Sequence, residues 1–219
     1  MCGRYNLTRD PEEWLAARVI NRLDEPFQPA YNIAPRTTQP VVRLDDDGRP
    51  ELVAMNWGFV PRWASPGQKL KPQINARSEQ ATRKPMFRAS MRDRRCLVPA
   101  TGFYEWQSSE TGKQPYHLHL GGKPFLMAGI WDDGSLEQAQ GDAPSFAILT
   151  TEANEAVAPL HDRMPVVVSV RDLPAWLEDG DDRLLRPLAS EYLQVEPVTK
   201  RINSPRNDDA SVLAPPDAD

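Results

Sequence analysis

The sequence predicts a single α+β domain. Short apolar runs with the alternation of β-strands dominate the chain, and helical segments are interspersed without the regular strand–helix–strand order of a parallel sheet. The 22 prolines, about twice the usual share, favour short helices and many connections. Hydrophobic residues make up 40% of the 219 positions and include six tryptophans, which is enough material for a substantial core.

The first half of the chain is predicted to contain two helical segments and one hairpin. The sequence Asp-Pro-Glu-Glu at 10–13 is typical of a helix start, because it supplies an N-cap, a proline in the first turn and acidic side chains near the helix N-terminus. The apolar runs at 40–44 and 51–55 flank a polar turn, and this pattern predicts a β-hairpin. A basic helical segment is expected at 78–94.

The second half is predicted to be mostly strand. In order, we expect short strands at 96–99 and 103–106, a hairpin of 116–120 with 125–131, a strand at 145–151, a short helix at 154–160, a buried strand at 166–168, two short helices around Trp176 and Leu184, and a strand at 195–198. No repeat or long linker interrupts these elements, so we expect one domain over 1–207. Residues 208–219, rich in Asp, Ala and Pro, are predicted to be a disordered acidic tail.

The composition also limits the classes of partner. The N-terminus has no signal peptide and no stretch approaches a membrane span, so we expect a cytoplasmic protein with no membrane partner. Cys2 and Cys96 are too few for a disulfide framework. The net charge of −5 argues weakly against a nucleic-acid partner, yet residues 77–95 hold seven Arg and Lys against two acidic residues. We therefore expect a local basic face, which would steer a polyanion.

Cys2 is the first candidate for chemistry. Initiator methionine is normally removed before a small residue, and removal of Met1 would leave a free α-amine beside the Cys2 thiol. With ordinary pKa values of about 7.7–8.0 and 8.5, both groups can be nucleophiles near neutral pH. Such an aminothiol condenses with an aldehyde to an imine, which the thiol then closes to a thiazolidine ring. An incidental or buried cysteine near a terminus is the alternative.

Three further residues are candidates for acid-base or polar roles. Glu105 lies between aromatic residues on a predicted strand, where an apolar setting would raise its pKa; a solvent-facing glutamate is the alternative. His161 follows the predicted helix at 154–160 and could shuttle protons or cap the C-terminus of that helix. Asn75 precedes the basic segment, where its amide could cap a helix or polarise a substrate hydroxyl.

Arginine and tryptophan side chains supply candidate DNA contacts. Arg4, Arg77 and Arg163 each lie within two residues of a proposed chemical residue, which suggests forks for phosphates; surface ion pairs are the alternative. Trp57 and Trp63 could stack on bases or wedge a duplex junction, and burial in the core is the alternative for both; for Trp57 we predict the core.

The remaining histidines are interpreted as structural. His117 and His119 alternate with Tyr116, Leu118 and Leu120, so both point to one face of a strand. They lack a third ligand at a recognisable spacing, and we expect no metal site and no cofactor.

Seven short motifs follow one another along nearly the whole chain. They are 1–5 (MCGRY), 31–35 (YNIAP), 57–61 (WGFVP), 74–79 (INARSE), 102–106 (GFYEW), 160–165 (LHDRMP) and 203–207 (NSPRN). Together they resemble the SRAP (SOS response-associated peptidase) family, whose members shield abasic sites. The resemblance implies a compact α+β domain with a mostly antiparallel, barrel-like β-sheet core and short peripheral helices.

The resemblance also implies a role for each candidate residue. Cys2 would form a thiazolidine crosslink with the ring-opened aldehyde of an abasic site in single-stranded DNA, and Asn75 would hold the terminal amine and the sugar. Glu105 would be the acid-base catalyst that helps to open the sugar ring, and His161 would assist proton transfer, including in reversal of the crosslink. The DNA contacts would come from Arg4, Arg77, Arg163, Thr150 and Trp63.

An abasic site has no base to read, so we expect DNA binding that is independent of sequence. We also expect the protein to act as a monomer and to have replication-fork proteins as further partners. Two alternatives stay open. In the first, Cys2, His161 and Asn75 form a thiol peptidase. A related expectation is that Cys2 removes Met1 in cis, as an autoproteolytic hydrolase, in addition to its lyase-like Schiff-base chemistry. A non-covalent single-stranded DNA-binding module would leave Cys2 inert.

Overall fold

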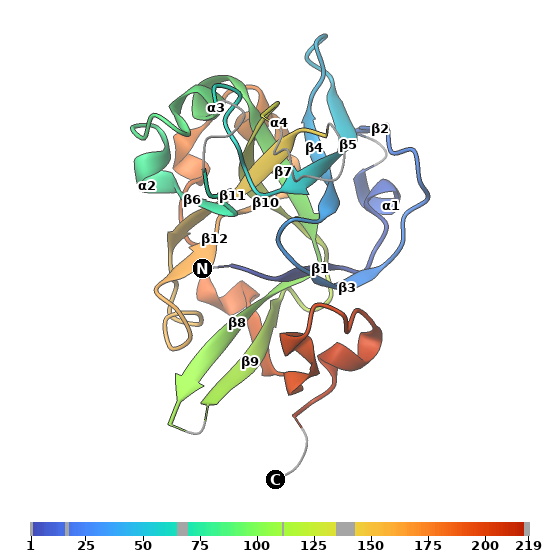
Figure 1. Cartoon of the computed structure of the whole chain (residues 1–219), viewed down its shortest axis with the longest axis vertical. Coiled ribbons are helices and arrows are strands. Elements are labelled where there is room, and N and C mark those ends of the chain that lie inside the picture. Colours follow the sequence, from blue (N-terminus) through green and yellow to red (C-terminus); the bar gives the residue numbers. More distant parts are fainter. Residues whose placement is uncertain (1, 16–17, 65–69, 111, 135–142, 217–219) are drawn as a thin grey trace.

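The structure, a computed structural model of the chain, describes residues 2–15, 18–64, 70–110, 112–134 and 143–216. Within these residues two β-sheets carry the fold, and short helices lie around them (Figure 1). The α+β architecture predicted from the sequence is confirmed. No helix in the described part of the chain is both long and apolar enough to cross a membrane.

The smaller sheet is antiparallel, with the strand order β14-β9-β8-β1-β3. Its strands are β1 (Tyr5–Leu7), β3 (Ala30–Ile33), β8 (Gly102–Ser109), β9 (Gly112–His119) and β14 (Gln194–Pro197). Strand β1 pairs with β8 on one side and with β3 on the other. The N-terminal strand is therefore paired along both of its edges. It lies between the β8–β9 hairpin and the larger sheet (Figure 1).

The larger sheet closes on itself. Its strands are β2 (Ile20–Asn21), β4 (Thr38–Leu44), β5 (Pro50–Trp57), β6 (Asn75–Arg77), β7 (Arg95–Ala100), β10 (Phe125–Asp132), β11 (Ser145–Glu152), β12 (Arg163–Pro165) and β13 (Val167–Val168). Strands β5, β4, β7, β10 and β11 pair in that order, and β11 pairs back with β5 through Phe146 opposite Trp57. The barrel-like core implied by the family resemblance is thus a closed ring of strands.

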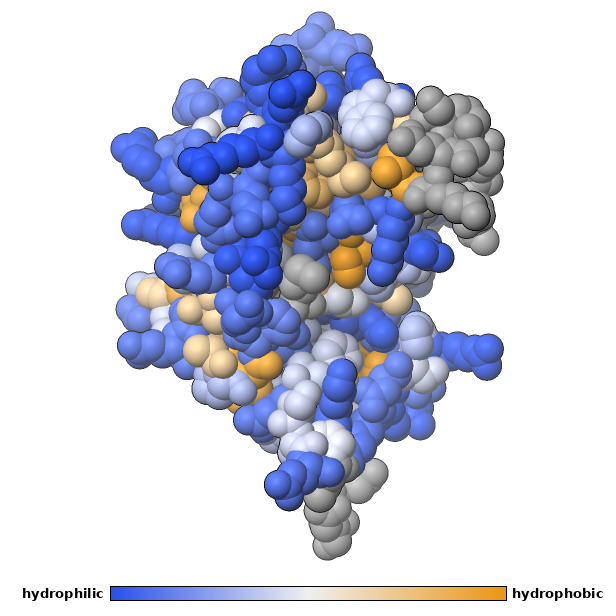
Figure 2. Space-filling model, turned by 60° about the vertical axis from the view of Figure 1, so that its left-hand side comes forward, coloured by the Kyte–Doolittle hydropathy of each residue, from blue (hydrophilic) through white to orange (hydrophobic). Residues whose placement is uncertain are grey.

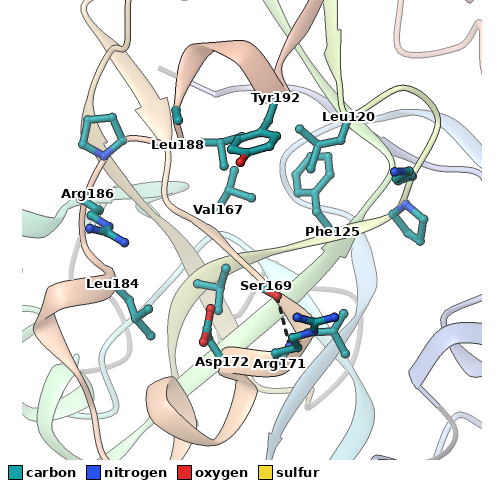
Figure 3. Close-up of a pocket in the computed structure, with 16 residues that line it drawn as sticks. Leu120, Phe125, Val167, Ser169, Arg171, Asp172, Leu184, Arg186, Leu188 and Tyr192 are labelled. Atoms are coloured by element: carbon teal, nitrogen blue, oxygen red, sulfur yellow. Dashed lines mark hydrogen bonds between the residues drawn. The ribbon is translucent and has the colours of Figure 1, made fainter.

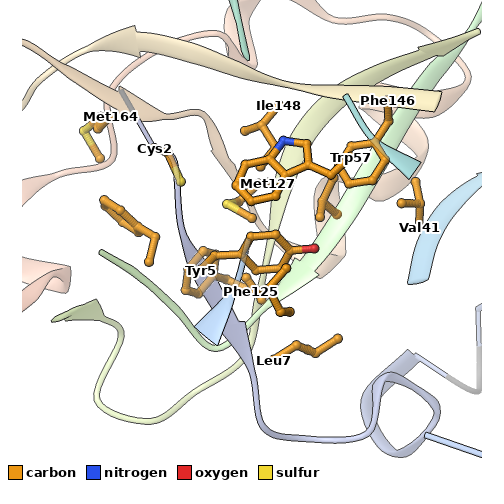
Figure 4. Close-up of a cluster of buried hydrophobic side chains, with 14 of the residues drawn as sticks. Cys2, Tyr5, Leu7, Val41, Trp57, Phe125, Met127, Phe146, Ile148 and Met164 are labelled. Atoms are coloured by element: carbon orange, nitrogen blue, oxygen red, sulfur yellow. The ribbon is translucent and has the colours of Figure 1, made fainter. Parts of the chain in front are cut away.

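Alternation along the ring strands separates two hydrophobic clusters. Phe125 and Met127 of β10 face the inner cluster, whereas Leu126 and Ala128 face the outer one. The inner cluster also contains Trp57, which is fully buried as predicted (Figure 4). The outer cluster is covered by α1 (Pro11–Leu15), α2 (Ser78–Ala81), α3 (Arg88–Asp93) and α4 (Leu173–Leu177).

The predicted hairpin of 116–120 with 125–131 is wrong. Strand β9 pairs with β8 and β14 in the smaller sheet, whereas β10 pairs with β7 and β11 in the larger one. Gly121 and Gly122 have φ angles of +62° and +73°, a conformation that glycine adopts without strain, and they turn the chain from one sheet to the other. The glycine turn was recognised correctly, but its two strands separate.

Two predicted helices are interrupted. The basic segment 78–94 forms α2 and α3 rather than one helix, because Pro85 has no N–H to donate and disfavours helical backbone before it. Residues 154–160 form hydrogen-bonded turns, in which Ala158 N donates to Asn154 O at 2.9 Å. Pro159 cannot extend that pattern into a helix.

The C-terminal residues pack on the smaller sheet. Short 3₁₀ helices lead to this end: η1 (Val170–Asp172), η2 (Asp182–Leu184), η3 (Ser190–Tyr192), η4 (Lys200–Asn203) and η5 (Ala210–Leu213). Asp208 Oδ1 accepts from the backbone N–H groups of Tyr31 (2.5 Å) and Asn32 (2.7 Å) on the edge strand β3, and Val212 is buried. The sequence predicted a disordered tail here, but residues 208–216 pack against the smaller sheet, because the acidic side chain of Asp208 accepts from donors at the edge of β3. Residues 217–219 lie outside the described residues.

Candidate active site

Cys2 lies in the interior, just before β1. Its side chain is fully buried in the inner cluster, near Tyr5 and Met164 (Figure 4). The chain is fixed there because Tyr104 N of β8 donates to Arg4 O at 3.0 Å. The Cys2 thiol donates to the same carbonyl across 3.8 Å.

The surroundings keep the Cys2 thiol protonated. Burial raises the pKa of the Cys2 thiol far above its usual value, and the negative charge of Glu105 raises it further. A protonated thiol is a poor nucleophile, so reaction at sulfur requires a base at that moment. The charge effect also shows that Glu105 and Cys2 are close.

Asn75 contacts Cys2 directly. Strand β6 pairs in parallel with β11, with Asn75 opposite Ile148, and this places the amide beside the N-terminal segment. Asn75 Nδ2 donates to Cys2 O at 2.8 Å. Among the described residues, the buried Asn75 Oδ1 has no hydrogen-bond partner. A buried acceptor of this kind is costly unless a ligand or a rearranged group supplies a donor.

Glu105 is a buried carboxyl on β8. Glu105 is 4% exposed, and its strand pairs with β1, which directly follows the N-terminal segment. Burial raises the pKa of Glu105, and nearby positive charge, including that of His161, opposes the rise. A carboxyl with a raised pKa holds its proton closer to neutral pH than an ordinary glutamate, which suits a general acid.

His161 follows the turns at 154–160. The backbone N–H of Arg163 donates to His161 Nδ1 at 2.9 Å, which requires a lone pair on Nδ1. Asp162 Oδ1 lies 2.8 Å from the same nitrogen, and that contact is favourable only when Nδ1 carries a proton. The two contacts are alternatives, and since the backbone donor is fixed, the neutral ring carries its proton on Nε2.

Arg163 is held by protein acceptors. Its Nη1 and Nη2 donate to the two carboxylate oxygens of Glu79, each at 2.8 Å, and Nη2 also donates to Thr150 O at 2.5 Å. The buried Oγ1 of Thr150 has no hydrogen-bond partner among the described residues. Arg163 was predicted from its position in the sequence, Thr150 was implied by the family resemblance, and Glu79 had no predicted role. The available signal for Glu79 was an acidic residue inside a basic segment.

Arg4 joins three segments. Its Nη1 donates to Asn32 Oδ1 at 2.6 Å and to Ile202 O at 3.2 Å, and burial lowers the pKa of the guanidinium. This fork therefore ties the N-terminus to β3 and η4. Asn32 is a second residue without a predicted role, and its amide donates to three backbone carbonyls: those of Ile202, Ser204 and Asn207.

The remaining predicted DNA contacts are exposed. Arg77 lies at the end of β6, opposite Thr150 of β11, and its side chain is exposed. Trp63 is 53% exposed, and none of the described contacts joins it to Cys2. On α2, α3 and their connection, Arg83, Lys84 and Arg88 are exposed and make no described ion pair. Hydrophilic side chains predominate on the face that Figure 2 shows, with smaller hydrophobic patches between them.

Some basic residues of the segment have structural roles. Arg92 pairs with Asp93, Arg94 with Asp132, and Arg95 lies over the ring of Trp176. Within the described residues, no group of three His, Cys, Asp or Glu side chains is arranged to hold a metal ion. The chemistry available at the site is that of a thiol, a carboxyl, an imidazole and an amide.

The fold and the site define an α+β protein with a buried cysteine near its N-terminus as the candidate nucleophile. The chain belongs to the SRAP family (SOS response associated peptidase), whose family model matches residues 1–205. It is 32% identical to abasic site processing protein YoaM of Bacillus subtilis, over 97% of both chains. It is 30% identical to abasic site processing protein YedK of Escherichia coli, over 98% of this chain and 100% of that protein.

Similarity extends to vertebrate proteins and to solved structures. Abasic site processing protein HMCES of Xenopus tropicalis is 27% identical over 98% of this chain and 78% of its own length. A crystal structure of a protein from Bacteroides thetaiotaomicron has a TM-score of 0.83 at 23% identity and covers 98% of this chain and 99% of that one. That likeness shows a shared fold.

Proposed function

We propose that the chain processes abasic sites in DNA by attaching itself to them covalently through Cys2. The observation that supports this most is the set of groups around Cys2: Asn75 on its carbonyl, Glu105 close enough to influence its thiol, and His161 close enough to influence Glu105. Relatives named as abasic site processing proteins, similar over nearly the whole chain, support the same substrate.

The reaction begins with the loss of Met1. While the Met1–Cys2 peptide bond is intact, the nitrogen of Cys2 is an amide and cannot condense with an aldehyde. Hydrolysis of that bond with one water frees the α-amine. Asn75 Oδ1, a buried acceptor without a described partner, is suited to accept a hydrogen bond from this amine and so to orient it.

Ring closure then consumes the aldehyde. The amine attacks the aldehyde carbon of the ring-opened deoxyribose, water leaves, and an imine forms. The Cys2 sulfur adds to the imine carbon, and the thiol proton is transferred to the imine nitrogen. The net change is aldehyde plus aminothiol to thiazolidine plus water. Glu105 is the acid-base catalyst for sugar opening and for proton transfer, and His161 assists, including in reversal.

Phosphates on either side of the abasic sugar are bound without reading sequence. Arg77 and the exposed cations of α2 and α3 form the outer contacts, with Trp63 beside the strand. Arg4, Arg163 and Thr150 line the inner part, where the fork of Arg163, held by Glu79 and the Thr150 carbonyl, becomes available to a phosphate when Glu79 releases it. The ligand that this arrangement favours is single-stranded DNA.

General proteolysis is supported less well. A thiol peptidase would use Asn75 to orient His161 beside the thiol. The described contact of Asn75 is instead with the carbonyl of Cys2 itself. Removal of Met1 by Cys2 in cis is compatible with this geometry, because the bond to be cut adjoins the thiol, and we include it in the proposal.

The test is covalent capture on a denaturing gel. Mature protein, with loss of Met1 verified by mass spectrometry, is incubated with a single-stranded oligonucleotide that carries one uracil, with and without uracil glycosylase. We expect a shifted band only with the glycosylase, and none for Cys2→Ala. A Cys96→Ala variant is the matched control, because Cys96 is equally buried but far from the N-terminus in sequence.

Three outcomes would contradict the proposal. Absence of a shifted band with verified mature protein would exclude covalent attachment. Salt-sensitive but fully reversible binding would favour a non-covalent DNA-binding module. Cleavage of an unstructured protein substrate that depends on Cys2 would favour the peptidase.

A further inference from the structure

A cavity of about 710 Å³ is lined by none of the residues assigned to the candidate active site. It is bounded by the start of β10, by β13 and η1, and by the segment 184–192 (Figure 3). Its volume is within the usual range for ligand sites. The apolar part of its lining consists largely of Leu120, Phe125, Val167, Leu188 and Tyr192, which lie together at one end (Figure 3).

The other part of the cavity is positively charged. Lys123, Arg171 and Arg186 are exposed lining residues, and Asp172 is the one acidic residue among the lining, so three positive charges against one negative leave +2. None of the ion pairs among the described residues involves these three cations. On a chain of net charge −5, this is a local site for anionic groups.

Tyr192 lies uncovered at the apolar end. Its side chain is 62% exposed, more than those of Trp63 (53%) and Ile20 (37%), the other exposed large hydrophobic residues in the described part of the chain. The backbone of Tyr192 is fixed in η3, where its N–H donates to Ala189 O at 3.2 Å. A positioned, uncovered tyrosine beside an apolar hollow is typical of protein-binding hot spots.

We propose that this cavity is a docking site for a peptide segment of a partner protein. The segment is acidic and ends in large apolar side chains. The apolar side chains would fill the end between Phe125, Val167 and Tyr192. The carboxylates would face Arg171, Arg186 and Lys123, where arginine forks favour bidentate contacts. The backbone of Arg171 is held in η1, because its backbone N–H donates to Ser169 Oγ at 3.2 Å (Figure 3).

A nucleic acid fits this cavity less well. Backbone tracking needs cations along an open groove with aromatic faces at successive positions. Here the cations border an apolar hollow, and one tyrosine is exposed. The chain's denser row of exposed cations lies elsewhere, on α2 and α3. Charge complementarity with an apolar anchor therefore favours an acidic peptide.

Binding of a synthetic probe tests the proposal. The probe is a fluorescein-labelled hexapeptide of four acidic residues followed by Leu and Phe with a free carboxyl terminus, titrated against the full chain and read by anisotropy. Two control peptides replace the acidic residues by Gln or the Leu-Phe end by Ser-Ser. We expect the probe to bind at least about tenfold more tightly than either control, since both halves of the site contribute.

Surface variants locate the bound probe. Arg186→Glu and Tyr192→Ala should each weaken binding by about tenfold or more. Arg18→Glu, an equal charge change at an exposed residue outside the lining, should leave it nearly unchanged. Thermal unfolding of each variant checks the fold, and all three positions are exposed.

Several results would overturn the proposal. Equal binding of the Gln peptide would show that the cavity takes apolar ligands without charge selection. Displacement of the probe by an oligothymidylate would assign the cations to nucleic acid, and a change of oligomeric state in Tyr192→Ala would assign the cavity to a second copy of the chain. Unchanged probe affinity in both cavity variants, or no binding at millimolar concentration, would also exclude it.

Discussion

Acidification should destabilise the fold through one buried histidine. His117 of β9 stacks on His119 at 4.7 Å between ring centroids and lies 5.1 Å from the ring of Tyr104. The side-chain amide of Asn6 lies 3.1 Å from His117 Nε2, and an Nδ2 donor there requires the neutral ring with its proton on Nδ1. Burial, with a smaller contribution from the charge of His119, lowers the pKa of His117 from 6.5 to about 3.

The sign and the size follow from linkage. Between pH 6.5 and 3 the unfolded chain binds a proton at His117 that the folded chain does not, so stability falls as the pH falls through this window. Each pH unit costs at most about 1.4 kcal/mol, which gives about 5 kcal/mol across the whole window. That is comparable with the total stability of a small domain, roughly 5–15 kcal/mol. Above pH 6.5 the contribution is fully present.

Urea unfolding followed by tryptophan fluorescence measures this contribution. Between pH 7.5 and 5.0, His117 should account for about 2 kcal/mol of lost stability. His117→Gln should lack this part of the pH dependence, whereas His161→Gln, the control, should retain it. The carboxylates contribute equally to the pH dependence of the unfolding free energy in all three proteins, so their contribution cancels in the comparison. Equal losses in wild type and His117→Gln would refute the reasoning.

The residues assigned roles in the proposed function, and the neighbour Glu79, give three further predictions. Glu105→Gln should slow crosslinking in a single-turnover gel assay more than it weakens binding of the same oligonucleotide without glycosylase treatment, because the amide cannot transfer a proton; equal losses would show a binding role instead. His161→Ala should slow release of a preformed crosslink, measured by transfer to an excess of a second abasic oligonucleotide, and an unchanged rate would remove His161 from reversal. Glu79→Gln should free the fork of Arg163 for phosphate, so anisotropy with undamaged single-stranded DNA should show affinity increased about threefold over Glu155→Gln. A decrease would show that Glu79 is needed to hold Arg163 in place.

Local patterns predicted the elements whose causes are local. The helix that begins at Pro11, the strand β14 and the burial of Trp57 follow from capping residues, alternation and size, and all three were predicted. The proximity of Cys2 to Asn75 was implied by the family resemblance, and spacing alone did not show it. These residues are 73 positions apart and meet because β6 pairs with β11 beside the N-terminal segment.

Features that depend on tertiary pairing were not predictable from local sequence. Strand alternation at 116–131 is the same whether the two strands pair with each other or enter different sheets, and the structure has the second arrangement. The composition of the acidic C-terminal residues predicts disorder. Composition carries no information about the backbone N–H groups at the edge of β3, which donate to Asp208. The attachment of Glu79 to Arg163 likewise depends on two segments 84 positions apart.

The burial of Cys2 has a consequence for the lifetime of the thiol. Peroxides oxidise exposed cysteine thiolates first to sulfenic acid and then irreversibly further, and alkylating reagents also consume exposed thiolates. The Cys2 side chain is inaccessible, and its raised pKa keeps the sulfur protonated. A reactive residue stored in this way is spared by diffusible oxidants while it waits, and it becomes available when a substrate and a proton acceptor reach it together. On the proposed function, the interior of the strand ring therefore protects the Cys2 thiol until its substrate arrives.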